Sequence, residues 1–231
     1  MRKISSLILS AVVLLSFVII SLSVSAMASP QLMVIEWSVE QLDGKVTLYV
    51  TPPTDDSETN PDYQLLSYHW FSTANYLINP KNKYGFTTSD VVSTITASAN
   101  AWDDETSYAV FAYKGTTSKA AGKYDRANVV SWGSYRAGVI AVTYIWSIGS
   151  QIVETDMRLN TFYKWTLSGE AGKMDVQNIV THEFGHWCGL KDLYGDADYW
   201  LTMYGYADYG ETYKQTVGLG DINGLEAVYG P

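Results

Sequence analysis

The stretch from His182 to Asp192, HEFGHWCGLKD, constrains the fold and chemistry of this chain more than any other part of its sequence. His182 and His186 are four residues apart, so on a helix their side chains project from one face, one turn apart. This spacing allows two imidazole nitrogens to bind one zinc ion at about 2.0–2.1 Å each. Glu183 lies roughly 80° around the helix from the midpoint of the two histidines. That angle is too large for a third ligand, yet it leaves the carboxylate near enough to hold a water molecule bound to the metal.

The residues after the two histidines supply a turn and a third ligand. Gly189 comes near the helix end, where a residue without a side chain can adopt φ > 0 and reverse the chain. Asp192 follows three residues later and can return a carboxylate to the metal. Asp196 and Asp198 are the substitutes for this ligand, although solvation or calcium binding fits them better. Two histidines, one aspartate and an open position for water make a catalytic zinc site.

This pattern resembles the metzincin metallopeptidases, whose helix reads H-E-x-x-H-x-x-G-x-x-H and is followed by a methionine turn. Asp192 stands here where most of that clan has histidine, as in some secreted bacterial members. The segment LTMYGY at 201–206 is similar to the methionine turn, and the matrixin branch is the closest match. The resemblance implies that Met203 forms a hydrophobic floor under the zinc. It also implies that Tyr204 and Tyr206 lie near the pocket for the residue after the scissile bond.

The resemblance covers most of the chain from Tyr68 to Gly230 and implies an α+β fold. We expect a metzincin-like, matrixin-like catalytic domain at 63–231, with a twisted mixed β-sheet, an active-site helix, the methionine turn and a C-terminal helix at Gly220–Gly230. Glu154–Asn160 resembles the edge strand above the active-site helix, which can pair with an extended peptide.

Hydrophobic patterning predicts where the strands and helices lie. The strand-like stretches are 68–78, 108–113, 128–132, 139–146 and 151–160. Ser89 or Asp90 caps a helix whose apolar face includes Val92, Ile95, Ala99 and Trp102. Asp175 caps the active-site helix, which turns Val176, Val180, Phe184 and Cys188 toward the core. We read 192–213 as a long functional loop.

The amino terminus predicts export. Arg2 and Lys3 precede an apolar run from Ile4 to Val24, and Ala26-Met27-Ala28 offers a signal-peptidase site. We therefore expect a signal peptide at 1–28 and a secreted protein without stable membrane association. The alternative is an uncleaved anchor, because about 20 apolar residues can span a bilayer. Either way, the folded part works outside the cytoplasm.

Residues 29–62 are expected to form a hairpin and an acidic linker. The chain alternates in strand-like fashion from Leu32 to Val50 around Asp43-Gly44, and a polar, proline-punctuated stretch, Thr51–Asp62, follows. The hairpin fits a small pro-segment, a docking element or the first strands of the domain. Cys188 is the only cysteine, so no intramolecular disulfide forms, and we expect it to pack in the core. His69 is expected on a strand surface or in packing rather than at a metal.

These features together predict a monomeric secreted zinc endopeptidase that acts on protein or peptide substrates, with Glu183 as general base. The net charge of −9 excludes a basic nucleic-acid footprint and leaves carboxylates available for structural Ca²⁺. Two histidines and a carboxylate also form the facial triad of non-haem iron oxygenases, although those sites normally lie in β-barrels. The other alternative is a non-catalytic extracellular protein that keeps the metal site and binds a peptide or glycan in an aromatic cleft.

Overall fold

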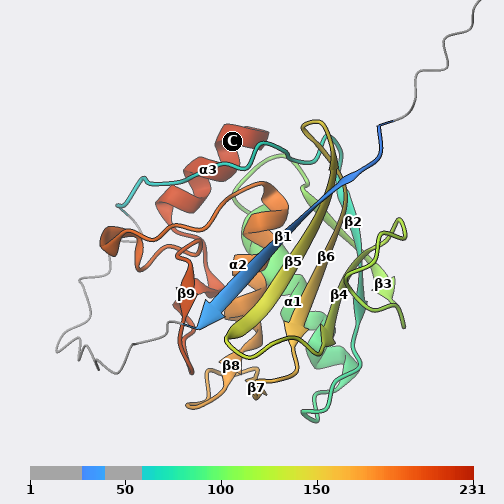
Figure 1. The fold of residues 1–231 in the computed structure, drawn as a ribbon. Helices are drawn as coiled ribbons and strands as arrows, with labels where there is room; N and C mark the ends of the chain where they lie inside the picture. The colour runs from blue at the N-terminus through green and yellow to red at the C-terminus, as the bar shows by residue number, and fades with distance from the viewer. Residues whose placement is uncertain (1–27, 40–58) are drawn as a thin grey trace, which may run out of the picture.

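One mixed β-sheet dominates the structure, a computed structural model that describes residues 28–39 and 59–231. Within these residues the sheet has seven strands in the order β3-β2-β4-β6-β5-β1-β9. Helices α1 and α2 pack against each other behind it (Figure 1), so the α+β class predicted from the sequence is confirmed. The strands are β1 (Gln31–Val39), β2 (Ala74–Asn79), β3 (Phe111–Thr116), β4 (Asn128–Gly133), β5 (Val139–Ile148), β6 (Gln151–Asn160) and β9 (Tyr206–Ala207).

Strand direction changes at β5. Strands β3, β2, β4 and β6 are mutually parallel, whereas β5 is antiparallel to both β6 and β1. Two short strands, β7 (Trp165–Thr166) and β8 (Met174–Asp175), form a separate parallel pair just before α2. The prediction that Glu154–Asn160 is an edge strand is wrong, because β6 lies between β4 and β5. The strand β5 contacts the helix at Val176–Cys188.

Helix α1 (Thr88–Asp103) begins slightly earlier than expected. Its cap is Thr87 rather than Ser89 or Asp90, because the Thr87 hydroxyl accepts the amide of Asp90 while the Asp90 carboxylate accepts the amide of Thr87. Ile95, Ala99 and Trp102 face the core as predicted, but Val91 takes the buried position expected for Val92.

Helix α2 (Val176–Cys188) has the predicted ends. The Asp175 carboxylate accepts the amide of Asn178 at 3.0 Å, and Gly189 ends the helix with φ 97°. The expected spine is fully buried and consists of Val176, Val180, Phe184 and Cys188. The same helix buries His182, Glu183 and His186 completely, so the metal centre lies inside the molecule rather than on an open face.

The amino-terminal strand pairs with distant parts of the chain. β1 pairs antiparallel with β5 from Gln31↔Ser147 to Ser38↔Val139. It is therefore an integral strand of the sheet, although its partner is about 100 residues away in sequence. The predicted leader through residue 27, the Asp43-Gly44 turn and most of the linker lie outside the described residues.

Two other strand predictions need correction at their amino-terminal ends. β2 begins at Ala74 rather than Tyr68, and His69 forms only an isolated bridge, with Gln151. β3 begins at Phe111, because Asp103 at the end of α1 accepts the amides of Val110 and Phe111 and holds the chain at the sheet entrance.

The segment predicted as a long loop at 192–213 contains short regular elements, although its sequence has no helical periodicity. These are one 3₁₀ turn, strand β9 and the start of a second 3₁₀ turn. Helix α3 (Leu219–Tyr229) closes the chain close to the predicted position. In the part of the chain that the structure describes, no helix is long and apolar enough to cross a bilayer.

Candidate metal centre

Helix α2 and the turn that follows it bring three predicted ligands together. The rings of His182 and His186 lie edge to face, with centroids 4.8 Å apart. After the reversal at Gly189, Asp192 Oδ1 lies 3.1 Å from His182 Nε2 and 3.5 Å from His186 Nε2. All three ligand atoms lie within 4.8 Å of one another. Among residues 28–39 and 59–231, no other group of three His, Cys, Asp or Glu side chains converges in this way.

The two substitute aspartates are not part of this group. Asp198 is occupied elsewhere, because its carboxylate accepts the amide of Gly195 at 3.0 Å and the side-chain amide of Asn60 at 3.0 Å. Asp196 is exposed at the start of a 3₁₀ turn. The structure thus brings Asp192, and neither of its substitutes, to the histidines.

Carbonyl groups fix the orientation of both imidazoles. His182 Nδ1 lies 2.7 Å from the carbonyl oxygen of Thr202, and His186 Nδ1 lies 2.9 Å from that of Leu190. A carbonyl can only accept, so each Nδ1 carries the proton and donates it. Nε2 is then the ring nitrogen of each histidine that faces Asp192 and can bind a metal once it is unprotonated.

The donor set fits a tetrahedral zinc ion. His182 Nε2, His186 Nε2 and Asp192 Oδ1 are buried, and none makes a well-formed hydrogen bond with the described part of the chain. Buried polar atoms are normally paired, so three unpaired ones at a single point indicate a missing partner. Ligand atoms bound to zinc at about 2.0–2.1 Å lie about 3.3 Å apart in a tetrahedron. The separations of 3.1 and 3.5 Å bracket that value.

The neighbouring charges push the pKa values of the ligands apart. Burial lowers the pKa of His182 to about 4, and the charge of His186 adds to this effect. Burial opposes protonation of His186 as well, but the carboxylates of Asp192 and Glu183 raise its pKa to about 9. The imidazoles in turn hold the pKa of Asp192 well below its usual range, against the effect of its burial.

Glu183 lies beside the ligands with one oxygen engaged and one unpaired. Its Oε2 accepts the hydroxyl of Thr143 from β5, whereas Oε1 is buried without a hydrogen-bond partner in the described chain. Burial raises the pKa of Glu183 to about 7, while His186 and Thr143 lower it in part. A carboxyl group with a pKa near neutrality is suited to general acid–base catalysis.

Met203 packs beneath the helix between the two histidines. A Cβ added to Gly185 would lie only 2.1 Å from Met203 Sδ, so this contact requires a glycine at position 185. Asp221 of α3 fixes the same turn, because its carboxylate accepts the amides of Thr202 at 2.7 Å and Met203 at 3.1 Å. Met203 is thus buried against α2 at Gly185, and its role as a floor under the zinc stays a prediction.

Tyr204 and Tyr206 lie around a buried lysine that the sequence did not single out. Lys214 is fully buried, and its ammonium group pairs with Glu211 and donates to the carbonyl of Tyr206 at 3.0 Å. It lies 5.7 Å from the ring centre of Tyr204 and 5.7 Å from that of Trp37. We call the residues Trp37, Tyr204, Tyr206, Tyr213 and Lys214 the aromatic cluster.

A cavity of about 310 Å³ opens beside two of the candidate ligands, His186 and Asp192. It is lined by His186 and Asp192 of the centre together with Met33, Ile35, Gln64, Leu66, Lys191 and Tyr194. Burial and the charge of Asp192 raise the pKa of Tyr194 to about 12, so its phenol stays protonated at neutral pH. Tyr194, Thr143 and Trp37 were missed by sequence reasoning, since no motif spacing connects them to the histidines.

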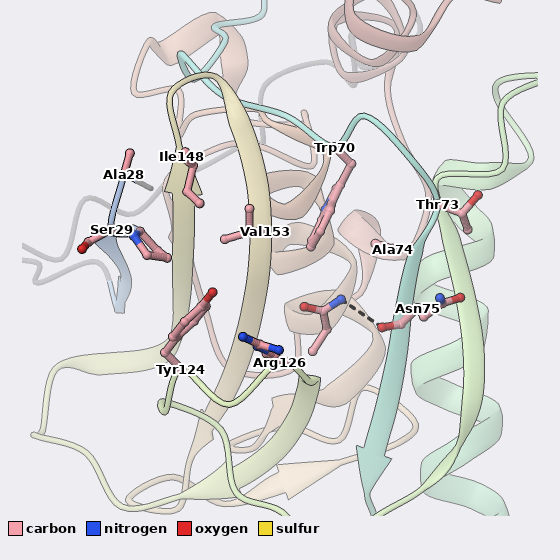
Figure 2. A pocket seen from close by; sticks show the side chains of 12 residues that line it. Ala28, Ser29, Trp70, Thr73, Ala74, Asn75, Tyr124, Arg126, Ile148 and Val153 are labelled. Atoms are coloured by element: carbon pink, nitrogen blue, oxygen red, sulfur yellow. Dashed lines mark hydrogen bonds between the residues drawn. The ribbon is translucent and has the colours of Figure 1, made fainter. Parts of the chain in front are cut away.

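A larger hollow of about 760 Å³ lies away from the metal centre (Figure 2). Trp70, Tyr124 and Arg126 surround it, and Asn128 donates to the carbonyl of Asn75 at 2.9 Å along its wall. It shares no lining residue with the cavity at His186. Because no metal-ligand group faces it, the His182–Asp192 centre is the stronger candidate for chemistry.

Comparison with known proteins adds no assignment. No protein-family model matches the chain, and no curated protein matches it.

Proposed function

We propose that this chain is a secreted zinc-dependent endopeptidase of the metzincin type, closest to the matrixin branch. One observation carries the proposal: three buried, unpaired ligand atoms converge at one point, beside the unpaired oxygen of Glu183. The packing of Met203 against Gly185 supports the family assignment. Export is inferred from the leader at 1–28, and peptide or protein substrates, a monomeric state and structural Ca²⁺ remain predictions.

Glu183 performs the proton transfers in this mechanism. Zinc held by His182, His186 and Asp192 would lower the pKa of a water molecule and polarise the scissile carbonyl. Glu183 accepts a proton from the attacking water while the water oxygen adds to the carbonyl carbon. It then gives this proton to the leaving amine as the C–N bond breaks. Thr143 holds the carboxylate in place through Oε2, which leaves Oε1 for the transferred proton.

The presence of Glu183 also separates this proposal from its rivals. A facial triad for iron needs only two histidines and one carboxylate, and a purely structural zinc needs no base. The fully buried carboxyl group of Glu183 costs stability, because burial disfavours its charged form, and neither rival explains why it is there. Peptide hydrolysis gives it a role as general base.

The test is hydrolysis of casein and a quenched peptide by the full chain and by Glu183→Ala, with the metal content of both determined. We expect Glu183→Ala to keep its zinc and to lose activity by about 10²–10⁴-fold, because general-base catalysis is lost. Glu170→Ala is the matched control, since Glu170 is exposed and pairs with Lys173 at the surface.

Two outcomes would contradict the proposal. Unchanged hydrolysis in Glu183→Ala would remove Glu183 from the mechanism. A zinc-loaded chain that binds peptides or glycans without turnover would identify the non-catalytic binding protein instead.

A further inference from the structure

Strand β1 lies against the candidate metal centre. It pairs with β5, whose Thr143 contacts Glu183, so it occupies the sheet position next to the general base. In Figure 1, β1 runs along β5 in front of α2 and ends beside β9. At that end Ser38 and Val39 pair in parallel with Tyr206 and Ala207.

Three side chains on one face of β1 lie next to the candidate metal ligands or the cavity beside them. Met33, Ile35 and Trp37 are two residues apart, so they project from the same face of the strand. Met33 and Ile35 line the cavity beside His186 and Asp192. Trp37 stacks on His182 with ring centroids 3.7 Å apart and an interplanar angle of 7°.

Trp37 also joins the metal centre to the aromatic cluster. Its side chain is only 1% exposed. The Lys214 ammonium group lies over the indole ring, 5.7 Å from the ring centre. The pairing of β1 with β5 is irregular between Trp37 and Ser38, and such a bulge re-aims a side chain. The indole thereby fills the space between a metal ligand and the buried lysine.

The other face of β1 is partly open to solvent, although Glu36 on this face binds Tyr135 and Arg136. Leu32 is 53% exposed and Val34 is 41% exposed, although both are apolar. The backbone of β1 pairs with β5 along most of the strand. Trp37 is the most deeply buried side chain of β1 in the described part of the chain. Backbone pairing is tolerant of sequence, so any extended peptide of similar pattern can make the same hydrogen bonds.

We propose that β1 occupies, within its own chain, the place of an extended peptide at the metal centre. Peptides compete with it for β5, and those with a large aromatic residue in the position of Trp37 bind best. This inference rests on the proposed function only for its peptide substrate, since occupancy of the cleft is a binding property. It assigns to residues 31–39 a role in shielding the metal.

The experiment measures peptide binding without turnover. The full chain carries Glu183→Ala and is loaded with zinc, and the probe is a fluorescent peptide of sequence QLMVIEWSV, residues 31–39. Adding Trp37→Ala to the chain should tighten binding of this peptide by about tenfold or more, because the competing strand is weakened. Val34→Ala, on the opposite face, is the matched control and should change the affinity by less than about twofold.

The peptide is varied in the same two positions. Alanine in place of its tryptophan should abolish most of the binding, whereas alanine in place of the valine should not. The proposal would be overturned if the peptide bound equally well to the Glu183→Ala chain with and without Trp37→Ala. It would also be overturned if the peptides with alanine for tryptophan and alanine for valine bound with equal affinity. β1 would then be an ordinary sheet strand.

A reversible lock tests the same point if Trp37→Ala fails to fold. Gln31 and Ser147 are directly opposite each other on β1 and β5, at a spacing of about 4.5–5.5 Å that a disulfide can bridge. The double variant Gln31→Cys with Ser147→Cys should bind peptide only after reduction. Identical binding by the oxidised and reduced forms would contradict displacement of β1.

These readouts separate the two proposals. Because the Glu183→Ala background removes turnover, absence of hydrolysis in the parent chain does not affect the binding result. A chain that cleaves peptides but binds QLMVIEWSV equally well with and without Trp37 would refute only the inference about β1.

Discussion

At the scale of single residues, the charges of Asp192 and Glu183 around the buried His186 predict how metal binding depends on pH. Its pKa of about 9 means that the imidazole carries a proton at neutral pH before a metal binds. The same nitrogen must be unprotonated to act as a ligand. His182, with a pKa of about 4, is already neutral under the same conditions.

Zinc binding at pH 7 should therefore release about one proton per chain. The affinity should rise with pH, by up to about tenfold per unit, and level off as the pH passes the pKa of His186 near 9. Calorimetry in buffers of different ionisation enthalpy measures this release directly. His69→Ala is the control, because the His69 ring packs against Phe71 and Tyr229 away from the ligands. Binding enthalpies that do not depend on the buffer would contradict the pairing of His186 with Asp192.

Thr143 should set the lower limit of the pH range for activity. Its hydroxyl favours the charged form of Glu183, so Thr143→Val should raise the pKa of that carboxyl above its value of about 7. Since a general base must be unprotonated, the acid limb of the kcat/KM profile should move upward by about one pH unit. Thr143→Ser restores the donor and should restore the profile. An unchanged acid limb in Thr143→Val would show that another group titrates there.

Local spacing predicted the residues that share one helix and its turn, and little else at the site. His182, Glu183, His186 and Asp192 lie within eleven residues, where helix geometry fixes their relative positions. Thr143 reaches Glu183 from 40 residues away. That contact depends on the order of strands in the sheet, which no local pattern encodes.

At the scale of elements, Asp221 connects α3 to the methionine turn. Its carboxylate accepts three backbone amides, those of Thr202, Met203 and Gly218. The fully buried Asp221 thus holds the turn that also supplies the carbonyl for His182.

Asp221→Ala should lower the free energy of unfolding by about 3 kcal/mol or more, because buried amides without acceptors cost about 1–3 kcal/mol each. Urea denaturation measures this change. Asp196→Ala is the matched control, since Asp196 is exposed and should leave stability within about 0.5 kcal/mol. Equal stability of the two variants would mean that the turn does not depend on α3.

The element boundaries that failed have identifiable causes. Thr87 with Asp90 forms a capping box, a stronger signal than the single polar residue that placed the start of α1 at Ser89 or Asp90. The sequence did not predict that β1 pairs with β5, whose residues lie about 100 positions later. Alternation of apolar residues identifies a strand without identifying its neighbour.

At the scale of the whole molecule, the sheet order determines what can approach the metal. Strand β5 contacts α2, β1 pairs with β5 in the same sheet, and β9 pairs with the end of β1 at Tyr206, a member of the aromatic cluster. The α+β class, which the resemblance to matrixins implied, is confirmed by the structure. The contact of residues 31–39 with the site was not predicted, because it joins the amino-terminal part of the chain to a helix about 145 residues later.

The most direct test of this account is the zinc content of the purified full chain, compared with Asp192→Ala and Asp198→Ala at a zinc concentration that saturates the wild type. The account predicts about one tightly bound zinc ion in the wild type and in Asp198→Ala, and a large loss in Asp192→Ala. A wild type without bound zinc would contradict it. So would an Asp192→Ala variant that keeps its metal while Asp198→Ala loses it.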